Sequence, residues 1–250
     1  MKVQLIILAT LVNTALQAQK AVLPKNYTPL SINVQYGAQK PLGILAQRFG
    51  INSTVGGSFE RVSLPKGWIL GVESYFIYGN KVKEDVLKNI RTPEGNIIGD
   101  IGTYATVFLK ERGFYTGINL GKLFTFTDNG NRVSGLRVTL GGGFLKHKIR
   151  ILNEDNAAPQ VTLPYSAGYD RMTYGMAFSQ FLGYQVISRN KTVNFTLGLD
   201  FTEGVTRNRR GFNFDTQKRD DAKRLDFLTG IHACWSIPLF TNQNADEIEY

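Results

Sequence analysis

Apolar and polar residues alternate along most of this chain, and this two-residue period constrains the fold more than any other feature of the sequence. The pattern is clearest in residues 30–36, 136–141, 171–178, 193–202 and 225–236. Successive side chains of a β-strand point to opposite faces, whereas a helix would repeat its apolar residues every three to four positions. The sequence therefore predicts an all-β protein.

The alternating runs are long, and their apolar faces carry Tyr, Trp and Phe near the ends of the runs. The opposite faces are rich in Gly, Ser, Thr and Asn, with single charges spaced far apart. Tilted membrane strands need about ten residues each and are flanked by aromatic girdles. The pattern favours a transmembrane β-barrel, while a soluble lipocalin-like barrel remains as an alternative.

The lengths of the connections predict the number of strands. Three connections are tight, at 62–67, 127–131 and 188–191, and four are longer, at 40–51, 80–103, 152–169 and 207–223. Short periplasmic turns alternate with longer external loops in outer-membrane barrels. A break at 111–113 would give nine strands and spoil this alternation, so 104–124 is read as one strand. The eight expected strands are 29–39, 52–62, 68–79, 104–124, 135–151, 170–187, 192–206 and 224–240.

The first 18 residues have the features of a cleaved signal peptide. Lys2 precedes a short apolar stretch that is too short to span a bilayer, and Ala15 to Ala18 offer small residues for cleavage. A buried N-terminal helix is the alternative. We expect a single antiparallel barrel over 19–240 and a periplasmic C-terminal tail over 241–250. An even strand count places both termini in the periplasm and the long loops outside the cell.

The alternation also predicts which charged residues point into the barrel. An eight-stranded barrel has an interior about wide enough for side chains to fill it. Opposite charges there should pair, because an isolated charge away from water is costly. We expect a filled, charge-paired lumen, with a narrow ion pathway as the alternative. The expected lumen residues are Glu60, Glu73, Glu111, Arg137, Arg171, Asp200, Asp226 and His232.

The chain is basic, with a formal net charge of +9, and its cations gather near the ends of two expected strands. Arginine and lysine at the external rim of a barrel can neutralise lipopolysaccharide phosphates through charge-assisted hydrogen bonds. A solvated loop, balanced by Asp215, Asp220 and Asp221, is the alternative. Nucleic acid is not expected outside the cell. The candidate contacts for lipopolysaccharide or a partner are Lys146, Lys148, Arg150, Arg207, Arg209, Arg210, Lys218 and Arg219.

The sequence offers little support for an enzyme, a metal site or a cofactor. His232 and Ser236 lie four residues apart on one strand face, which separates them by about 13 Å. His147, with Ser166 or Ser179, is no better specified as a base and nucleophile. The chain has only two histidines and one cysteine, Cys234, without the clustered spacing of metal ligands. A lipid-acting enzyme therefore stays a minor alternative.

Four segments in the second half of the chain carry a resemblance to known proteins: 143–151, 168–171, 208–215 and 224–226. Through them the chain resembles the small outer-membrane β-barrel proteins common in Bacteroidetes. The last expected strand ends at Trp235 to Phe240, similar to the aromatic end that barrel-assembly machinery reads, although the tail follows it. The resemblance implies the fold and the membrane and supplies no catalytic residues. Some such proteins are accessory subunits of larger machines for assembly or secretion, so we expect a structural or accessory barrel with a protein partner.

Overall fold

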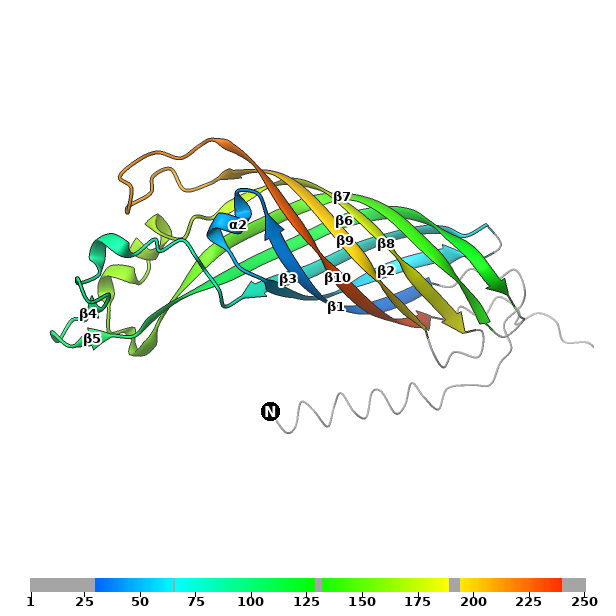
Figure 1. Ribbon diagram of the computed structural model, residues 1–250, viewed down its shortest axis with the longest axis horizontal. Coiled ribbons are helices and arrows are strands. Elements are labelled where there is room, and N and C mark those ends of the chain that lie inside the picture. The colour runs from blue at the N-terminus through cyan, green and yellow to red at the C-terminus, as the bar shows by residue number, and fades with distance from the viewer. Residues whose placement is uncertain (1–29, 65, 129–131, 189–193, 240–250) are drawn as a thin grey trace, which may run out of the picture.

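A computed structural model describes residues 30–64, 66–128, 132–188 and 194–239, and within these ranges the chain forms a closed antiparallel barrel. Eight strands make the wall in the order β1-β10-β9-β8-β7-β6-β3-β2 (Figure 1). The strands are β1 (Leu30–Leu42), β2 (Asn52–Ser63), β3 (Trp68–Gly79), β6 (Val107–Asp128), β7 (Arg132–Asn153), β8 (Thr173–Ser188), β9 (Phe195–Asn208) and β10 (Lys223–Leu239). The expectation of an eight-stranded all-β barrel is confirmed.

The register of the strands fixes the tilt of the wall. A row of paired residues that starts at Leu30 in β1 passes through all eight strands and returns to β1 at Lys40, ten residues further on. A stagger of this size in eight strands corresponds to a tilt of about 40°, and the interior is then just wide enough for side chains. Figure 1 shows the strands running obliquely to the long axis of the barrel.

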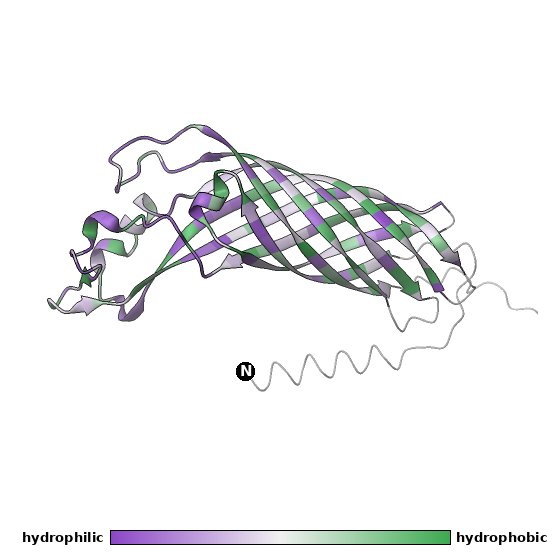
Figure 2. Cartoon of the chain, in the orientation of Figure 1, coloured by the Kyte–Doolittle hydropathy of each residue, from purple (hydrophilic) through white to green (hydrophobic). Residues whose placement is uncertain are grey.

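The outer face of the barrel is apolar. Apolar and polar residues alternate along each strand (Figure 2), and the apolar ones point outward. On β9, Phe195, Leu197, Leu199, Phe201 and Val205 are all exposed. From Phe195 to Val205 the tilted strand rises about 25 Å, which matches the apolar band of membrane barrels. A soluble lipocalin-like barrel would place these residues inside, so the distribution favours the membrane alternative.

The longer connections gather at one end of the barrel and fold into a cap (Figure 1). It contains α2 (Leu45–Arg48), η1 (Lys88–Ile90), the small hairpin of β4 (Ile97–Ile98) and β5 (Tyr104–Ala105), η2 (Glu154–Asn156), η3 (Pro159–Val161) and η4 (Tyr165–Gly168). No helix among the described residues is long and apolar enough to cross a membrane.

Most of the expected strands begin or end a few residues away from the predicted positions; the first, for example, ends at Leu42 and not at 39, and the fourth at Asp128 and not at 124. Two of the differences have a structural cause. Residues 104–105 belong to β5 in the cap, so the fourth wall strand begins at Val107 and not at 104. The sixth begins at Thr173 and not at 170, because Arg171 adopts φ 49° and breaks the extended backbone before it. The expected signal peptide (1–18) and C-terminal tail (241–250) lie outside the described residues and stay predictions, as does the location of the termini.

Candidate functional site

The middle of the lumen is built around one buried ion pair. Arg137 on β7 donates two hydrogen bonds to the carboxylate of Glu60 on β2, at 2.6 and 2.9 Å. Both side chains are almost fully buried. Ser58 and Asn119 also donate to Glu60, and the ring of Phe181 lies beside the guanidinium. This two-point contact crosses the barrel and ties two strands on different parts of the wall together.

The other expected lumen acids have neutral or weakly basic partners. Gln39 donates to Asp200 at 2.7 Å, and Asn52 donates to both oxygens of Glu111. Glu73 lines the central cavity, and His232 lies edge-on to Phe181. The lumen is therefore held by hydrogen bonds as much as by opposite charges. A cavity of about 40 Å³ remains at its centre, which is room for only a few water molecules.

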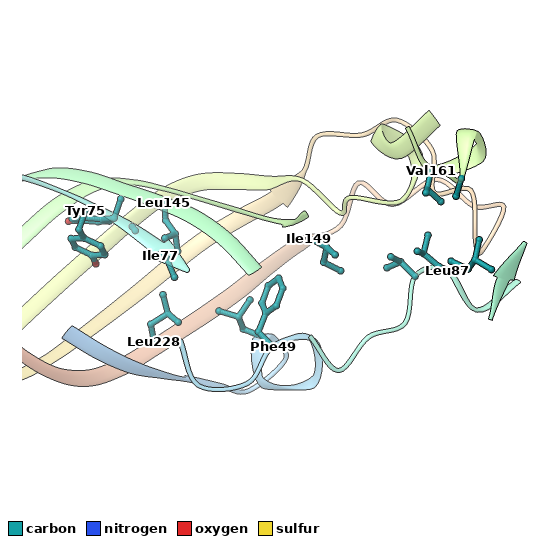
Figure 3. Packing of buried hydrophobic residues seen from close by; sticks show 14 residues of the cluster. Phe49, Tyr75, Ile77, Leu87, Leu145, Ile149, Val161 and Leu228 are labelled. Atoms are coloured by element: carbon teal, nitrogen blue, oxygen red, sulfur yellow. The ribbon is translucent and has the colours of Figure 1, made fainter. Parts of the chain in front are cut away.

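Apolar layers close the lumen above and below this polar middle. Near the short turns, a buried cluster of Val62, Leu64, Ile69, Leu123, Val133 and Ile187 fills the barrel. Near the cap, a second cluster runs from Tyr75, Ile77, Leu145 and Leu228 inside the barrel through Ile149 of β7 to Phe49, Leu87 and Val161 in the loops (Figure 3). Within the described residues, packed apolar side chains thus lie on both sides of the polar middle of the lumen.

Truncation of the upper layer should destabilise the barrel strongly. Leu145 is fully buried, so Leu145→Ala leaves a cavity and is expected to lower the free energy of unfolding by about 2–5 kcal/mol. Urea unfolding of the detergent-solubilised barrel, followed by its heat-modifiable gel mobility, measures this change. Leu182→Ala, on the exposed outer face of β8, is the matched control. Equal losses in the two variants would contradict the packing described here.

His147 anchors the upper layer to the wall. Its Nε2 lies 2.9 Å from a carboxylate oxygen of Asp226, and the Thr206 hydroxyl donates to the same oxygen. Phe49 from the cap packs edge-on against the imidazole. Nδ1 of His147 and Nε2 of His232 have no hydrogen-bond partner within the described part of the chain. Those two ring nitrogens therefore make no hydrogen bond to a serine hydroxyl within the described residues.

An ion network joins four loops of the cap. Glu84 accepts hydrogen bonds from Arg48 at 2.7 Å and from Arg171 at 2.9 Å, and Arg171 also donates to Asp215. Although burial opposes ionisation, the two guanidinium groups hold the pKa of Glu84 below its ordinary value. The prediction that Arg171 lies in the lumen is wrong: it precedes β8 and points into the cap.

An arginine of the predicted rim, Arg210, also holds the cap. Arg210 donates two hydrogen bonds to Asp170, at 2.6 and 2.9 Å. This contact raises the pKa of Arg210. Arg210 is thus engaged within the protein. The neighbouring Arg209 is exposed, and its guanidinium lies over the ring of Tyr174, 4.2 Å from the ring centroid. An open groove of about 970 Å³ lies between the β7–β8 loop and the β9–β10 loop. Its lining includes Arg209, Arg219, Phe212 and Phe214.

The remaining predicted rim cations lie on the outer surface. Lys146, Lys148 and Arg150 point outward from β7, Arg207 points outward from β9, and Lys218 and Arg219 are exposed in the cap. The structure adds two cations that the sequence did not single out, Lys110 and Arg112 on β6. Both residues lie on the outer face of β6, so the alternation of the sequence could have indicated that they point outward. Only the strand register shows which residues of β7 lie opposite them.

Groups of three or more metal-ligating side chains are absent from the described residues.

No protein-family model matches the chain, and no curated protein matches it. Solved structures with some similarity include the N-terminal barrel domain of Pseudomonas aeruginosa OprF, with 10% identity, 84% of this chain and 100% of that chain covered, and a TM-score of 0.37. Neisserial surface protein A shares 8% identity, with 84% and 97% covered and a TM-score of 0.41. Ail of Yersinia pestis shares 12%, with the same coverage and a TM-score of 0.38. These scores are low, and the barrel is established by the strand pairing of the chain itself.

Proposed function

We propose that this chain is a non-enzymatic outer-membrane β-barrel, a structural or accessory subunit of an outer-membrane complex that contacts lipopolysaccharide through its basic rim. The observation that carries the proposal is the combination of an apolar outer belt with a lumen closed at both ends. The belt suits a bilayer, and the sealed lumen leaves the outer surface and the cap for function. Long loops of such barrels face the outside, so we place the cap and rim there.

The proposed protein partner would bind at the cap. Phe212 and Phe214 are each 42% exposed beside the exposed Arg209 and Arg219, and aromatic and arginine side chains are enriched at protein interfaces. A tagged copy of the full chain, extracted from fractionated membranes in mild detergent, should bring down a stoichiometric outer-membrane protein identified by mass spectrometry. Recovery from the outer membrane as a lone barrel would contradict the role as a subunit.

The sealed lumen predicts an electrically silent protein. In planar lipid bilayers, the purified barrel is expected to give no stepwise conductance, because ions would have to pass both apolar layers. An established outer-membrane porin reconstituted in parallel is the positive control. Reproducible single-channel steps would support the alternative of a narrow pore.

An enzyme acting on outer-leaflet lipids is the second alternative. Incubation of the purified barrel with lipopolysaccharide, followed by mass spectrometry of the lipid, should leave its acyl chains intact. The physical reason is that neither imidazole has a hydroxyl partner within the described residues. Release of fatty acid that depends on either histidine would overturn the non-enzymatic assignment.

A further inference from the structure

Four cations face one another on the outer surface of the β6–β7 pair. The register places Lys110 directly opposite Arg150, and Arg112 directly opposite Lys148. Directly opposed side chains of antiparallel strands have Cβ atoms about 5 Å apart, and like charges at such positions are destabilising. We call these four residues the cation ladder.

The charge of the ladder is not balanced on its own face. Glu111, which lies between Lys110 and Arg112 in sequence, points inward and is 1% exposed. Within the described ranges, no ion pair joins any of the four side chains to a carboxylate. Arg112 donates to the carbonyl oxygen of Glu111, which leaves its charge unpaired. Two adjacent like-charge pairs thus lie on a rigid strand pair without an internal counterion.

The height of the ladder on the barrel indicates what neutralises it. Towards the short turns, the next pairs on the outer face are Phe114 with Lys146 and then Thr116 with Phe144. The exposed apolar residues Ile118 and Leu140 follow further down. Lys146 continues the cations of β7 towards Tyr174 of β8, which pairs with Arg207 of β9. The cations therefore lie just above the apolar belt, where lipid headgroups meet the barrel wall.

We infer that the cation ladder binds the phosphate groups of a phosphorylated glycolipid of the outer leaflet. Guanidinium and ammonium groups from both strands would donate charge-assisted hydrogen bonds to the phosphate oxygens, and the acyl chains would lie along the apolar wall below. Bound phosphate would also remove the repulsion across the strand pair. This inference rests on the proposed location in the outer membrane and names the lipid-binding site within the broader rim.

The test measures binding of lipid A to the purified full chain in detergent. The variant changes all four ladder residues to Gln. The matched control changes four exposed cations outside the proposed rim, Lys66, Lys81, Lys83 and Lys88, to Gln, with the same loss of charge. Bisphosphorylated lipid A should bind the ladder variant at least tenfold more weakly than the parent chain, and the control should bind as the parent does. Equal weakening in both variants would mean that general charge attracts the lipid, and this would overturn the inference.

A second readout separates binding from folding. The Tm of the parent chain should rise when bisphosphorylated lipid A is added, rise less with the monophosphorylated form, and stay unchanged with the dephosphorylated form. The single variant Lys110→Glu places a carboxylate opposite Arg150, so it should fold at least as stably as the parent and still lose most of the shift. A full shift in this variant would contradict the inference. An equal rise with inorganic phosphate alone would assign the site to free phosphate instead of a lipid.

Outer-membrane fractionation keeps the two proposals distinguishable. A chain that fractionates with the outer membrane but shows no effect of the ladder variant would disprove only the lipid site. A chain absent from the outer membrane would disprove the proposed function itself.

Discussion

Replacement of Arg137 by Met is expected to lower the free energy of unfolding of the barrel by about 3–5 kcal/mol, the largest effect of any single substitution in the lumen. The change leaves Glu60, which is 3% exposed, as an unpaired acid between two apolar layers. The measurement is urea unfolding of the barrel in detergent, with intrinsic fluorescence and gel mobility as independent probes.

Two further variants identify the cause of this loss. The double variant Glu60→Gln with Arg137→Met removes both charges and should recover much of the stability, because the penalty comes from the uncompensated charge. Arg61→Met removes a cation from the exposed face of the same strand as Glu60 and should cost little. If the Arg137→Met variant proved as stable as the parent, this would show that water reaches Glu60.

Replacement of Arg171 by Gln is expected to open the cap without unfolding the barrel. Arg171 joins Glu84 of one loop to Asp215 of another, and its own side chain is 4% exposed. Loss of a buried partner costs about 3–5 kcal/mol, and we expect about 2 kcal/mol here because Glu84 is a third exposed to solvent. Limited trypsin digestion should then cut the loops 80–106 and 209–222 much faster, while the barrel keeps its gel mobility.

The exposed Asp221 supplies the control for the cap. Asp221→Asn removes a neighbouring charge that lines the groove, keeps every trypsin site and should leave the digestion rate unchanged. If trypsin cut the loops of the Arg171 variant no faster than those of the parent, the ion network would not hold the cap. The apolar packing of Val86, Leu87 and Val161 would then be sufficient.

Acid should open the cap of the unmodified chain by the same route. The pKa values of Glu84 and Asp220 are both lowered by their arginine partners from the ordinary values of 4.5 and 3.8. A depressed pKa contributes stability that is present above the ordinary value and is lost as the pH falls through the folded one. Digestion of the cap by an acid-active protease should therefore accelerate below about pH 4.5 in the parent and change less in the Arg171→Gln variant.

Period-two alternation predicted the wall of the barrel well because it reports which side of a strand is buried. It placed Glu60 and Arg137 on the inner face, and both lie there. It failed at Arg171, where alternation continued in the sequence but a positive φ ended the strand. The alternation records local periodicity, whereas the backbone of a loop follows from contacts made elsewhere in the fold.

The partners of the charged residues were beyond the sequence for a different reason. Asp226 pairs with His147 and Asp200 with Gln39, residues 79 and 161 positions away. Only the closure of the ring and its stagger bring these positions together. The cation ladder was missed in the same way, because Lys110 and Arg112 become notable only when the register sets them against Arg150 and Lys148.

The seam between β1 and β10 has a consequence for how the chain acquires its structure. It pairs Leu30 with Leu239, so the wall closes only when the two most distant parts of the described chain meet. Such high contact order slows folding, since the entropy of closing long loops is lost before the contacts form. The hydrogen bond from Gln39 to Asp200 spans β1 and β9 across this seam. An open sheet would leave these polar groups hydrated, so ring closure and dehydration of the interior must be one late, cooperative event of assembly.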